Sequence, residues 1–249
     1  MSRAAALCCA LAALAVATVA DGALVRVNGI VLHADGGFQP QALPRHDFAP
    51  IEFQGHFEVD AQGGGRPVVL QEAVIDFDRD GRLLTAGLPT CAPEQVANAG
   101  VAEARAVCRG AIVGTGQVEA TIEAGGGAVP VSSALTIFNG PPQGGNPTAV
   151  LHARTPAPGA KTFAILVPIE RRPGAFRYRA TLAFPELAGG LGSITRVEAE
   201  VGRRFRRHGR SRSYVSARCS DGILRTHGRF TFADGTIIDG SVEKACSVR

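Results

Sequence analysis

The sequence predicts an all-β fold: an antiparallel β-sandwich of one large or two small domains, with a short disulfide-stapled helical hairpin. Three observations lead to this prediction. Apolar and polar residues alternate along several short segments, as they do in strands with one face in the core and one in water. Glycine and proline supply 31 and 15 of the 249 residues, which favours frequent turns over long helices. Cysteines bracket two segments of the chain.

The first 20 residues have the layout of a secretory signal peptide. Arg3 supplies a positive charge, an apolar run extends from Ala4 to Ala17, and small residues suited to cleavage follow. The run is shorter than the roughly 20 residues that a bilayer-spanning helix needs. We therefore expect residues 1–20 to be removed, and the mature protein to be secreted or extracellular, associated with the cell envelope, and without a transmembrane segment.

Residues 21–90 form the predicted N-terminal β region. IEFQGHFEV (Ile51–Val59) alternates apolar and polar residues, and VVLQEAVIDF (Val68–Phe77) continues the pattern. The turn sequences GGGRP (Gly63–Pro67) and DRDG (Asp78–Gly81) lie beside these segments. Asp-Gly supplies the positive φ that tight turns demand, so both segments are expected to be strands.

The cysteine count indicates structural disulfides. Removal of the leader leaves four cysteines, and an even number outside the cytosol is typical of disulfide bonding. A zinc site would need paired Cys or Cys/His spacings, which are absent. Four cysteines allow three pairings, and we favour pairs that are neighbours in sequence, Cys91 with Cys108 and Cys219 with Cys246.

The segment between Cys91 and Cys108 is predicted to be two short helices. A continuous helix from Pro93 to Cys108 would separate its ends by roughly 22 Å, whereas bridged cysteines have Cα atoms about 5 to 7 Å apart. Pro93 suits a first helical position, and Asn98-Ala99-Gly100 is a plausible stop. Residues 91–108 are therefore expected to form a stapled helical hairpin.

Residues 109–249 form the predicted C-terminal β-sandwich region, and the stapled hairpin is the expected boundary between the two regions. AIVGTGQVEATIE (Ala111–Glu123) and VSSALTIF (Val131–Phe138) are expected to be joined by the AGGG turn. TFAILVPI (Thr162–Ile169) is apolar nearly throughout, so we expect it to be buried on both faces. Pro168 places its end at an edge or a bulge.

Five motifs connect the chain with a group of proteins. In order they are GLPTC (Gly87–Cys91), CRGAIVGTG (Cys108–Gly116), IFNG (Ile137–Gly140), SYVSARC (Ser213–Cys219) and FTFADGT (Phe230–Thr236). In these motifs the chain resembles a group of secreted β-rich proteins of high-G+C bacteria. The resemblance covers most of the mature chain and implies a shared secreted β-rich fold with the same cysteine brackets. It carries over no catalytic residue.

The segment DFDRDGRLL contains a candidate metal site. It places the carboxylates of Asp76, Asp78 and Asp80 at alternate positions before Gly81, as in the first half of a calcium-binding loop. The twelfth position is Gly87, which offers no bidentate carboxylate, so the loop is incomplete. The alternative is a hairpin turn closed by Asp-Gly, with Asp76 and Asp78 on the solvent face.

The segment GRRFRRHGRSRS contains a candidate anion-binding site around a predicted His208-Gly209 turn. A guanidinium group binds an oxyanion through two parallel hydrogen bonds, and several such groups together create a positive electrostatic potential. Phosphates or acidic cell-envelope polymers are therefore candidate ligands. The alternative is a solvated hairpin tip whose charges discourage edge pairing. Few aromatic residues lie nearby, so we expect no specific nucleic-acid recognition. The cluster consists of Arg203, Arg204, Arg206, Arg207, Arg210 and Arg212.

The sequence contains no familiar enzyme motif. GxSxG, HExxH and a phosphate-binding glycine loop are absent, and the six histidines lack metal-ligand spacing. We therefore expect a secreted, non-catalytic β-sandwich protein without a cofactor, whose candidate partners are acidic envelope polymers. The alternative is an extracellular hydrolase with a site assembled from distant residues, such as a serine with His33 and Asp35 or with His46 and Asp47.

Overall fold

The computed structural model describes residues 22–155, 160–207 and 209–249. The expected signal peptide, residues 1–20, lies outside the described residues. The main feature of the described chain is a 12-stranded antiparallel sheet, in the order β1 (Ala23–Val27), β2 (Ile30–Gln39), β5 (Glu52–Ala61), β13 (Gly192–Val201), β8 (Ile112–Ala124), β9 (Gly127–Asn139), β10 (Thr148–Arg154), β11 (Thr162–Arg171), β12 (Phe176–Ala183), β6 (Leu70–Asp78), β17 (Ile223–Phe232) and β18 (Ile237–Ala245).

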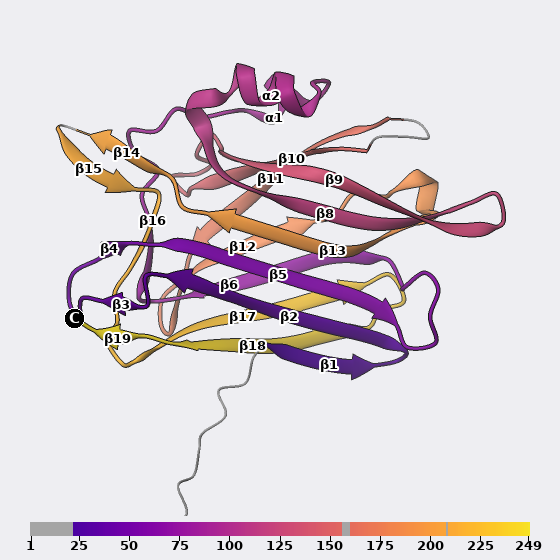
Figure 1. Cartoon of the computed structure of the whole chain (residues 1–249), viewed down its shortest axis with the longest axis horizontal. Helices are drawn as coiled ribbons and strands as arrows, with labels where there is room; N and C mark the ends of the chain where they lie inside the picture. The colour runs from indigo at the N-terminus through magenta and orange to yellow at the C-terminus, as the bar shows by residue number, and fades with distance from the viewer. Residues whose placement is uncertain (1–21, 156–159, 208) are drawn as a thin grey trace, which may run out of the picture.

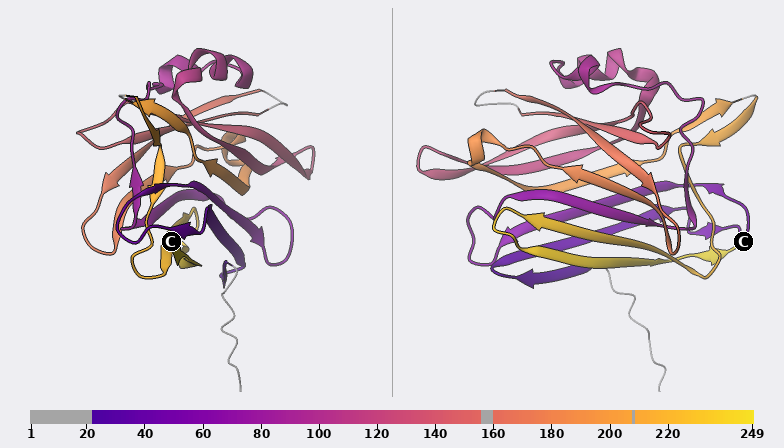
Figure 2. Two further views of the ribbon diagram at one scale, coloured as in Figure 1. Left: turned by 60° about the vertical axis from the view of Figure 1, so that its left-hand side comes forward. Right: turned by 180° about the vertical axis from the view of Figure 1, so that it is seen from behind.

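This sheet folds over on itself into two packed layers, so that its end strands β1 and β18 lie side by side (Figure 1). The second view in Figure 2 shows the same two layers from behind. The predicted all-β sandwich is therefore confirmed. Strands from residues 21–90 and from residues 109–249 are hydrogen-bonded neighbours, because β5 pairs with β13 and β6 lies between β12 and β17. Both regions thus contribute to one core.

Smaller sheets close one end of the sandwich. A three-stranded sheet places β16 (Val215–Ala217) between β4 (Ala49–Pro50) and β7 (Gly81–Leu83). The pair β14 (Arg204–Arg207) and β15 (Arg210–Ser213) forms a projecting antiparallel hairpin. The short strands β19 (Ser247–Val248) and β3 (Ala42–Leu43) pair in parallel. These pieces gather at the left end of the molecule in Figure 1.

The core fills the space between the two layers with inward-facing apolar side chains. On β5, Phe57 and Val59 are buried, Glu58 between them is half-buried, and Asp60 beyond them is exposed, as the alternation predicts. The ring of Phe57 packs edge-on against that of Phe230, with centroids 5.2 Å apart. Burying one such side chain contributes about 1.5–3 kcal/mol to folding. The alternating pattern of IEFQGHFEV therefore encodes one face of the core.

The glycine spacing in AIVGTG reflects a close approach of two strands. Gly116 on β8 faces Ala199 on β13, and a Cβ at Gly116 would overlap the carbonyl oxygen of Glu198. A side chain here would therefore push β13 away from β8. The predicted pairing of β8 with β9 through the AGGG turn is also present, with Ala124 opposite Gly127.

The stapled hairpin forms as predicted. Cys91 is bonded to Cys108 with Cα atoms 5.6 Å apart, and the bridge encloses α1 (Pro93–Val96) and α2 (Val101–Val107). The two helices lie on the outer face of β9, β10 and β11 (Figure 2). Val96 and Ala104 pack there against Phe138 and Val150. This covering explains why the β11 segment has apolar residues on both faces.

The second predicted disulfide is also present. Cys219, which follows β16, is bonded to Cys246, which follows β18, with Cα atoms 5.9 Å apart. Cys219 is buried in a small cluster with Leu43 and Ala217. The bridge therefore ties the C-terminal strands to the end of the sandwich that carries the smaller sheets. No helix in the described part of the chain is long and apolar enough to cross a membrane.

Candidate functional site

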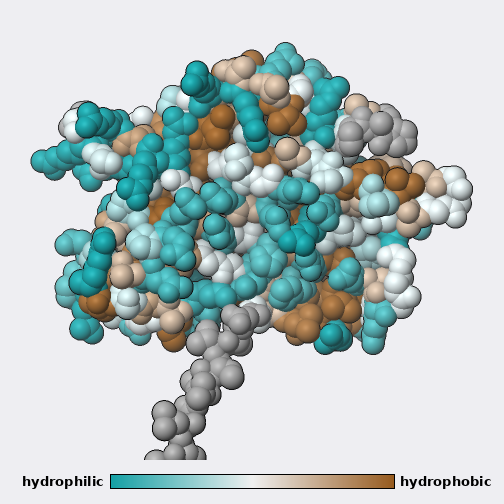
Figure 3. All heavy atoms as spheres, in the orientation of Figure 1, coloured by the Kyte–Doolittle hydropathy of each residue, from teal (hydrophilic) through white to brown (hydrophobic). Residues whose placement is uncertain are grey.

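The arginine cluster forms a β-hairpin, and its pairing register sorts the arginines onto two faces. Arg207 is paired with Arg210, and Phe205 with Arg212, so these side chains share one face of the β14–β15 hairpin. Arg204 and Arg206 alternate with them and project from the other face. Hydrophilic side chains cover this projecting hairpin at the left of Figure 3.

Arg203 has a different, structural position. It precedes the hairpin, and its Nη1 donates hydrogen bonds to the backbone carbonyls of Ile112 at 2.8 Å and Arg109 at 3.2 Å. These bonds fix the start of the hairpin to the segment that follows the stapled helices. Arg203 therefore does not belong with the arginines that face outward.

The face with Arg207 turns toward β7 and encloses an open hollow. Its volume is about 590 Å³, and its lining consists of Arg82, Leu84, Arg207, Arg210 and Arg212. Ligand pockets commonly measure about 300–1,000 Å³. The lining has four guanidinium groups and no acidic side chain. We call these four arginines, with Leu84, the arginine hollow.

None of the guanidinium groups of the arginine hollow forms an ion pair with a described carboxylate. The Nε atom of Arg82 is buried and has no hydrogen-bond partner among the described residues. Buried N–H groups in folded proteins are nearly always paired. Guanidinium groups carry a positive charge at physiological pH, so four positive charges line the hollow.

The positive charge continues beyond the arginine hollow onto an aromatic ring. The guanidinium of Arg82 lies over the ring of Phe48, 4.6 Å from its centroid. Arg218 and Arg177 approach the same ring at 5.2 Å and 5.3 Å. An aromatic face attracts cations through its quadrupole, so Phe48 holds three guanidinium groups near one another. Arg82 is the residue shared between this cluster and the hollow.

Gly87 lies against the side chain of Arg207, which lines the arginine hollow. It has φ +94°, which favours glycine, and a Cβ there would lie 3.0 Å from Cδ of Arg207. The glycine of the GLPTC motif therefore leaves room for the Arg207 side chain. A larger residue at this position would require the Arg207 side chain to shift.

Each of the three aspartates of the calcium-like motif accepts hydrogen bonds from its own partners within the protein. Asp76 accepts two hydrogen bonds from Arg179, at 2.8 and 2.7 Å, and this pairing lowers the pKa of Asp76. Asp80 accepts from Arg218 Nε at 2.7 Å and from the backbone N–H of Ser220 at 2.9 Å. Although burial opposes its ionisation, these hydrogen bonds hold the pKa of Asp80 below its ordinary value.

Asp78 accepts hydrogen bonds from the backbone N–H groups of Asp80 at 2.8 Å and Arg225 at 2.9 Å. Burial raises its pKa. No group of three or more histidine, cysteine, aspartate or glutamate side chains that could hold a metal ion occurs within the described ranges.

The hairpin interpretation of this motif was wrong in two respects. Asp76 and Asp78 are 5% and 8% exposed rather than solvated, because neighbouring arginines and backbone donors cover them. The strand after the Asp-Gly turn, β7, pairs with β16 and not back onto β6. The turn therefore sends the chain toward the arginine hollow, which is how Arg82 and Leu84 reach it.

The histidines offer no assembled catalytic site in the part of the chain that the structure describes. His33 packs edge-on against His56, and Asp35 is ion-paired with Lys244 at 2.9 Å. His46 and Asp47 are exposed. Among the described residues, no hydrogen bond joins a histidine to a serine. The hydrolase alternative stays a prediction.

His152 is the most buried of the histidines that the structure describes, and it was not a candidate from the sequence. It lies on β10 beneath the stapled helices, where Nε2 donates to the carbonyl oxygen of Ala99 at 3.1 Å. Its Nδ1 is buried without a hydrogen-bond partner. Burial lowers the pKa of His152, so the ring is held neutral. This residue fixes the hairpin position and does not face solvent.

The chain matches no protein-family model, no curated protein and no solved structure.

Proposed function

We propose that this protein is a secreted, non-catalytic β-sandwich that binds acidic polymers of the cell envelope through the arginine hollow. The observation that carries the proposal is the lining of that hollow, in which Arg82, Arg207, Arg210 and Arg212 converge without a carboxylate. Such a surface is complementary to a ligand that brings several negative charges at once.

The donor geometry favours phosphate or carboxylate groups on a linear chain. A guanidinium group presents five N–H donors in a planar fork, so two or more of them can surround each oxyanion. The arginine hollow is open to solvent, and its lining residues come from the projecting β14–β15 hairpin and from the segment of Arg82 and Leu84. A polymer can therefore lie across it, with one segment in the hollow and its neighbours near Phe48.

The extracellular location is supported by two features. Disulfides persist in oxidising compartments, and the described chain contains two of them. The N-terminal apolar run has the composition of an export signal. We therefore place the ligand among the anionic polymers that such a protein meets outside the cytoplasm.

The test compares two double variants with equal loss of charge. Arg207→Gln with Arg212→Gln removes two guanidinium groups from the hollow, whereas Arg204→Gln with Arg206→Gln removes two from the opposite face of the same hairpin. With linear inorganic polyphosphate as the probe at roughly 0.1 M salt, we expect the first variant to bind at least about tenfold more weakly and the second less than about threefold.

Both variants should keep the wild-type fold, because exposed charges contribute little to stability. Circular dichroism checks this. If both variants lost the same affinity, binding would depend only on the total positive charge of the hairpin. That result would refute the hollow as a site. Unchanged affinity in both variants would refute anion binding by this hairpin.

A further inference from the structure

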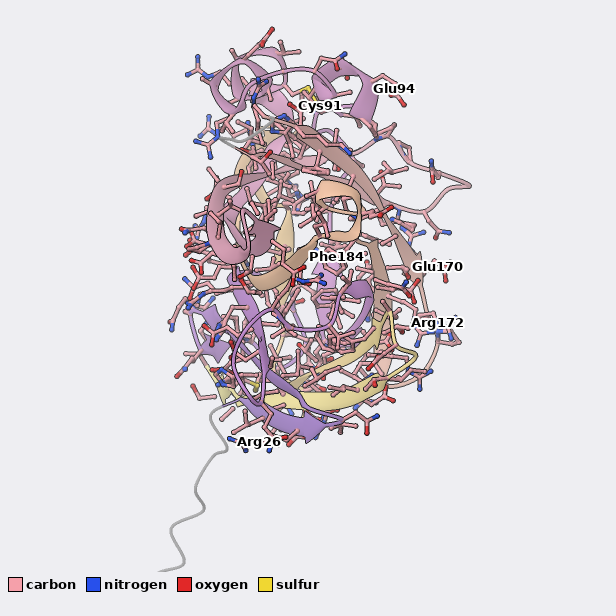
Figure 4. All side chains as sticks on the ribbon, turned by 90° about the vertical axis from the view of Figure 1, so that its right-hand side faces the viewer. Arg26, Cys91, Glu94, Glu170, Arg172 and Phe184 are labelled. Atoms are coloured by element: carbon pink, nitrogen blue, oxygen red, sulfur yellow. A yellow bond between two sulfur atoms is a disulfide. The ribbon has the colours of Figure 1, made fainter. Side chains whose placement is uncertain are left out.

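A narrow apolar cavity opens at the opposite end of the sandwich from the arginine hollow. Its volume is about 70 Å³. Figure 4 looks onto this end, where Phe184 lies between the two layers. The lining comes from both layers and includes Val118, Leu135, Leu151, Phe163, Leu182 and Phe184.

The interior is incompletely covered at this end. On β11, Val167 and Ile169 are buried at 3% and 7% exposure, as core residues should be. Phe163 and Ile165 belong to the same inward-facing row but are only half-buried. Leu182 on β12, the strand next to β11 in the sheet, is also half-buried. Apolar surface that faces inward therefore remains in contact with water, which is unfavourable.

The cavity offers nothing to a polar ligand. Its lining contains three hydroxyl groups, and all of them already have partners within the protein. Ser133 donates to the carbonyl of Arg154 at 2.6 Å, and Ser132 accepts from Gln117 at 2.8 Å. The third, Thr155, accepts from the backbone N–H of residue 161 at 3.0 Å. A polar group placed inside would lose its hydration among side chains that are almost all apolar.

The size of the cavity selects the shape of the ligand. A cavity of roughly 150 Å³ accommodates benzene, and the space here is about half as large. A ring or a branched group therefore does not fit, whereas the end of an unbranched alkyl chain does.

The rim extends the apolar contact beyond the cavity. Leu191 is 49% exposed and Val129 is 41% exposed, so both offer apolar surface to a ligand. The carbonyl of Leu191 accepts a hydrogen bond from Glu123, and Ile122 beside Glu123 is paired with Val129, so the two exposed side chains belong to one end of the sandwich.

We propose that this cavity binds the terminal methylenes of an unbranched aliphatic chain, methyl end first. The chain end displaces water from the apolar lining, and the following carbons lie against the rim at Val129 and Leu191. Each methylene buried in this way tightens binding about fourfold. The inference is independent of the arginine hollow, because no residue lines both sites.

The first experiment uses three small probes and the full mature chain. We expect n-octanol to bind, octanediol with a hydroxyl at each end to bind at least about tenfold more weakly, and adamantanol not to bind, as followed by chemical-shift titration. The diol must bury a hydroxyl, and adamantanol is too wide. Equal affinity for octanol and the diol, or tight binding of adamantanol, would overturn the proposal.

The second experiment fills the cavity. Ala153 on β10 lines it, whereas Ala134 on β9 is exposed on the outer face. We expect Ala153→Leu to weaken octanol binding at least about tenfold and Ala134→Leu to leave it unchanged. Should Ala153→Leu fail to fold, a diazirine-labelled octanol is photocrosslinked to the wild-type chain. Crosslinks at Phe163 or Leu182 support the proposal, and crosslinks confined to exposed Leu24 or Ile237 overturn it.

Discussion

Protonation of His152 is expected to loosen the stapled hairpin in mild acid. The carbonyl oxygen of Ala99 can only accept, so Nε2 of the neutral ring carries the hydrogen that it donates there. Nδ1 is then the site of protonation, and it is buried without a partner. Burial lowers the pKa, and the charges of Arg105 and Arg154 oppose protonation further. A proton on Nδ1 therefore destabilises the folded state.

The sign of the effect follows from proton linkage. The folded chain holds this proton more weakly than the unfolded chain, whose histidine titrates near the ordinary value of 6.5. Below that pH the unfolded state binds more protons, so the free energy of unfolding decreases as the pH falls toward the folded-state pKa. One proton contributes a slope of at most about 1.4 kcal/mol per pH unit. Above the unfolded pKa the contribution of His152 is constant.

The replacement His152→Leu removes this titration with little other damage. Thr162 Oγ1 also donates to the carbonyl of Ala99, at 3.2 Å, so that oxygen keeps one partner. The lost histidine hydrogen bond costs about 1 kcal/mol, and a leucine buried between Phe138 and the helices offsets much of it. We therefore expect a change within about 1 kcal/mol near pH 7.

The assay is denaturant unfolding of the disulfide-intact chain from about pH 7 to about pH 5. Wild-type stability should fall over this range more steeply than that of His152→Leu. His46→Ala, which removes an exposed histidine, is the control and should behave as wild type. The same pH dependence in wild type and His152→Leu would show that His152 does not control the hairpin.

Two further predictions concern the staple and the aspartate motif. Replacing Cys91 and Cys108 together by serine should lower the free energy of unfolding by about 3 kcal/mol, because the bridge closes a segment with a sequence separation of 17; an unchanged denaturation midpoint would contradict this. Replacing Asp80, which is 1% exposed, by asparagine should cost about 1.5–3 kcal/mol through loss of the charged hydrogen bond to Arg218. The loss should be the same with and without calcium, and a calcium-dependent rise in melting temperature that Asp80→Asn abolishes would restore the metal interpretation.

Much of the fold could be predicted because its signals are local. The alternation of apolar and polar residues in the β5 segment depends only on neighbouring residues. So does the conflict between one long helix and a disulfide across residues 91–108. Their outcomes, a strand at Glu52–Ala61 and two short helices under one disulfide, are those expected. The predicted arginine hairpin also formed, since Gly209 supplies a positive φ of 74° at its turn.

The composition of the candidate site could not be predicted in the same way. Arg82 reaches the arginine hollow because β7 pairs with β16, more than a hundred residues away, and no local pattern encodes that pairing. Phe48 lies in an irregular segment with no periodicity, so its three guanidinium neighbours depend wholly on tertiary structure. The same long-range packing buries Asp76 and Asp78, which a local interpretation assigns to solvent.

The positions of the two proposed sites determine how their tests relate. The arginine hollow is lined by the β14–β15 hairpin, which lies at the left end of Figure 1, and the apolar cavity is at the end that faces the viewer in Figure 4. A polyanion in the hollow therefore leaves the cavity accessible. A lipid phosphate that buried its chain in the cavity would hold its own head group at the wrong end for Arg207 and Arg212. The two ligands are thus separate molecules or separate parts of a long one, and failure of either proposal leaves the other standing.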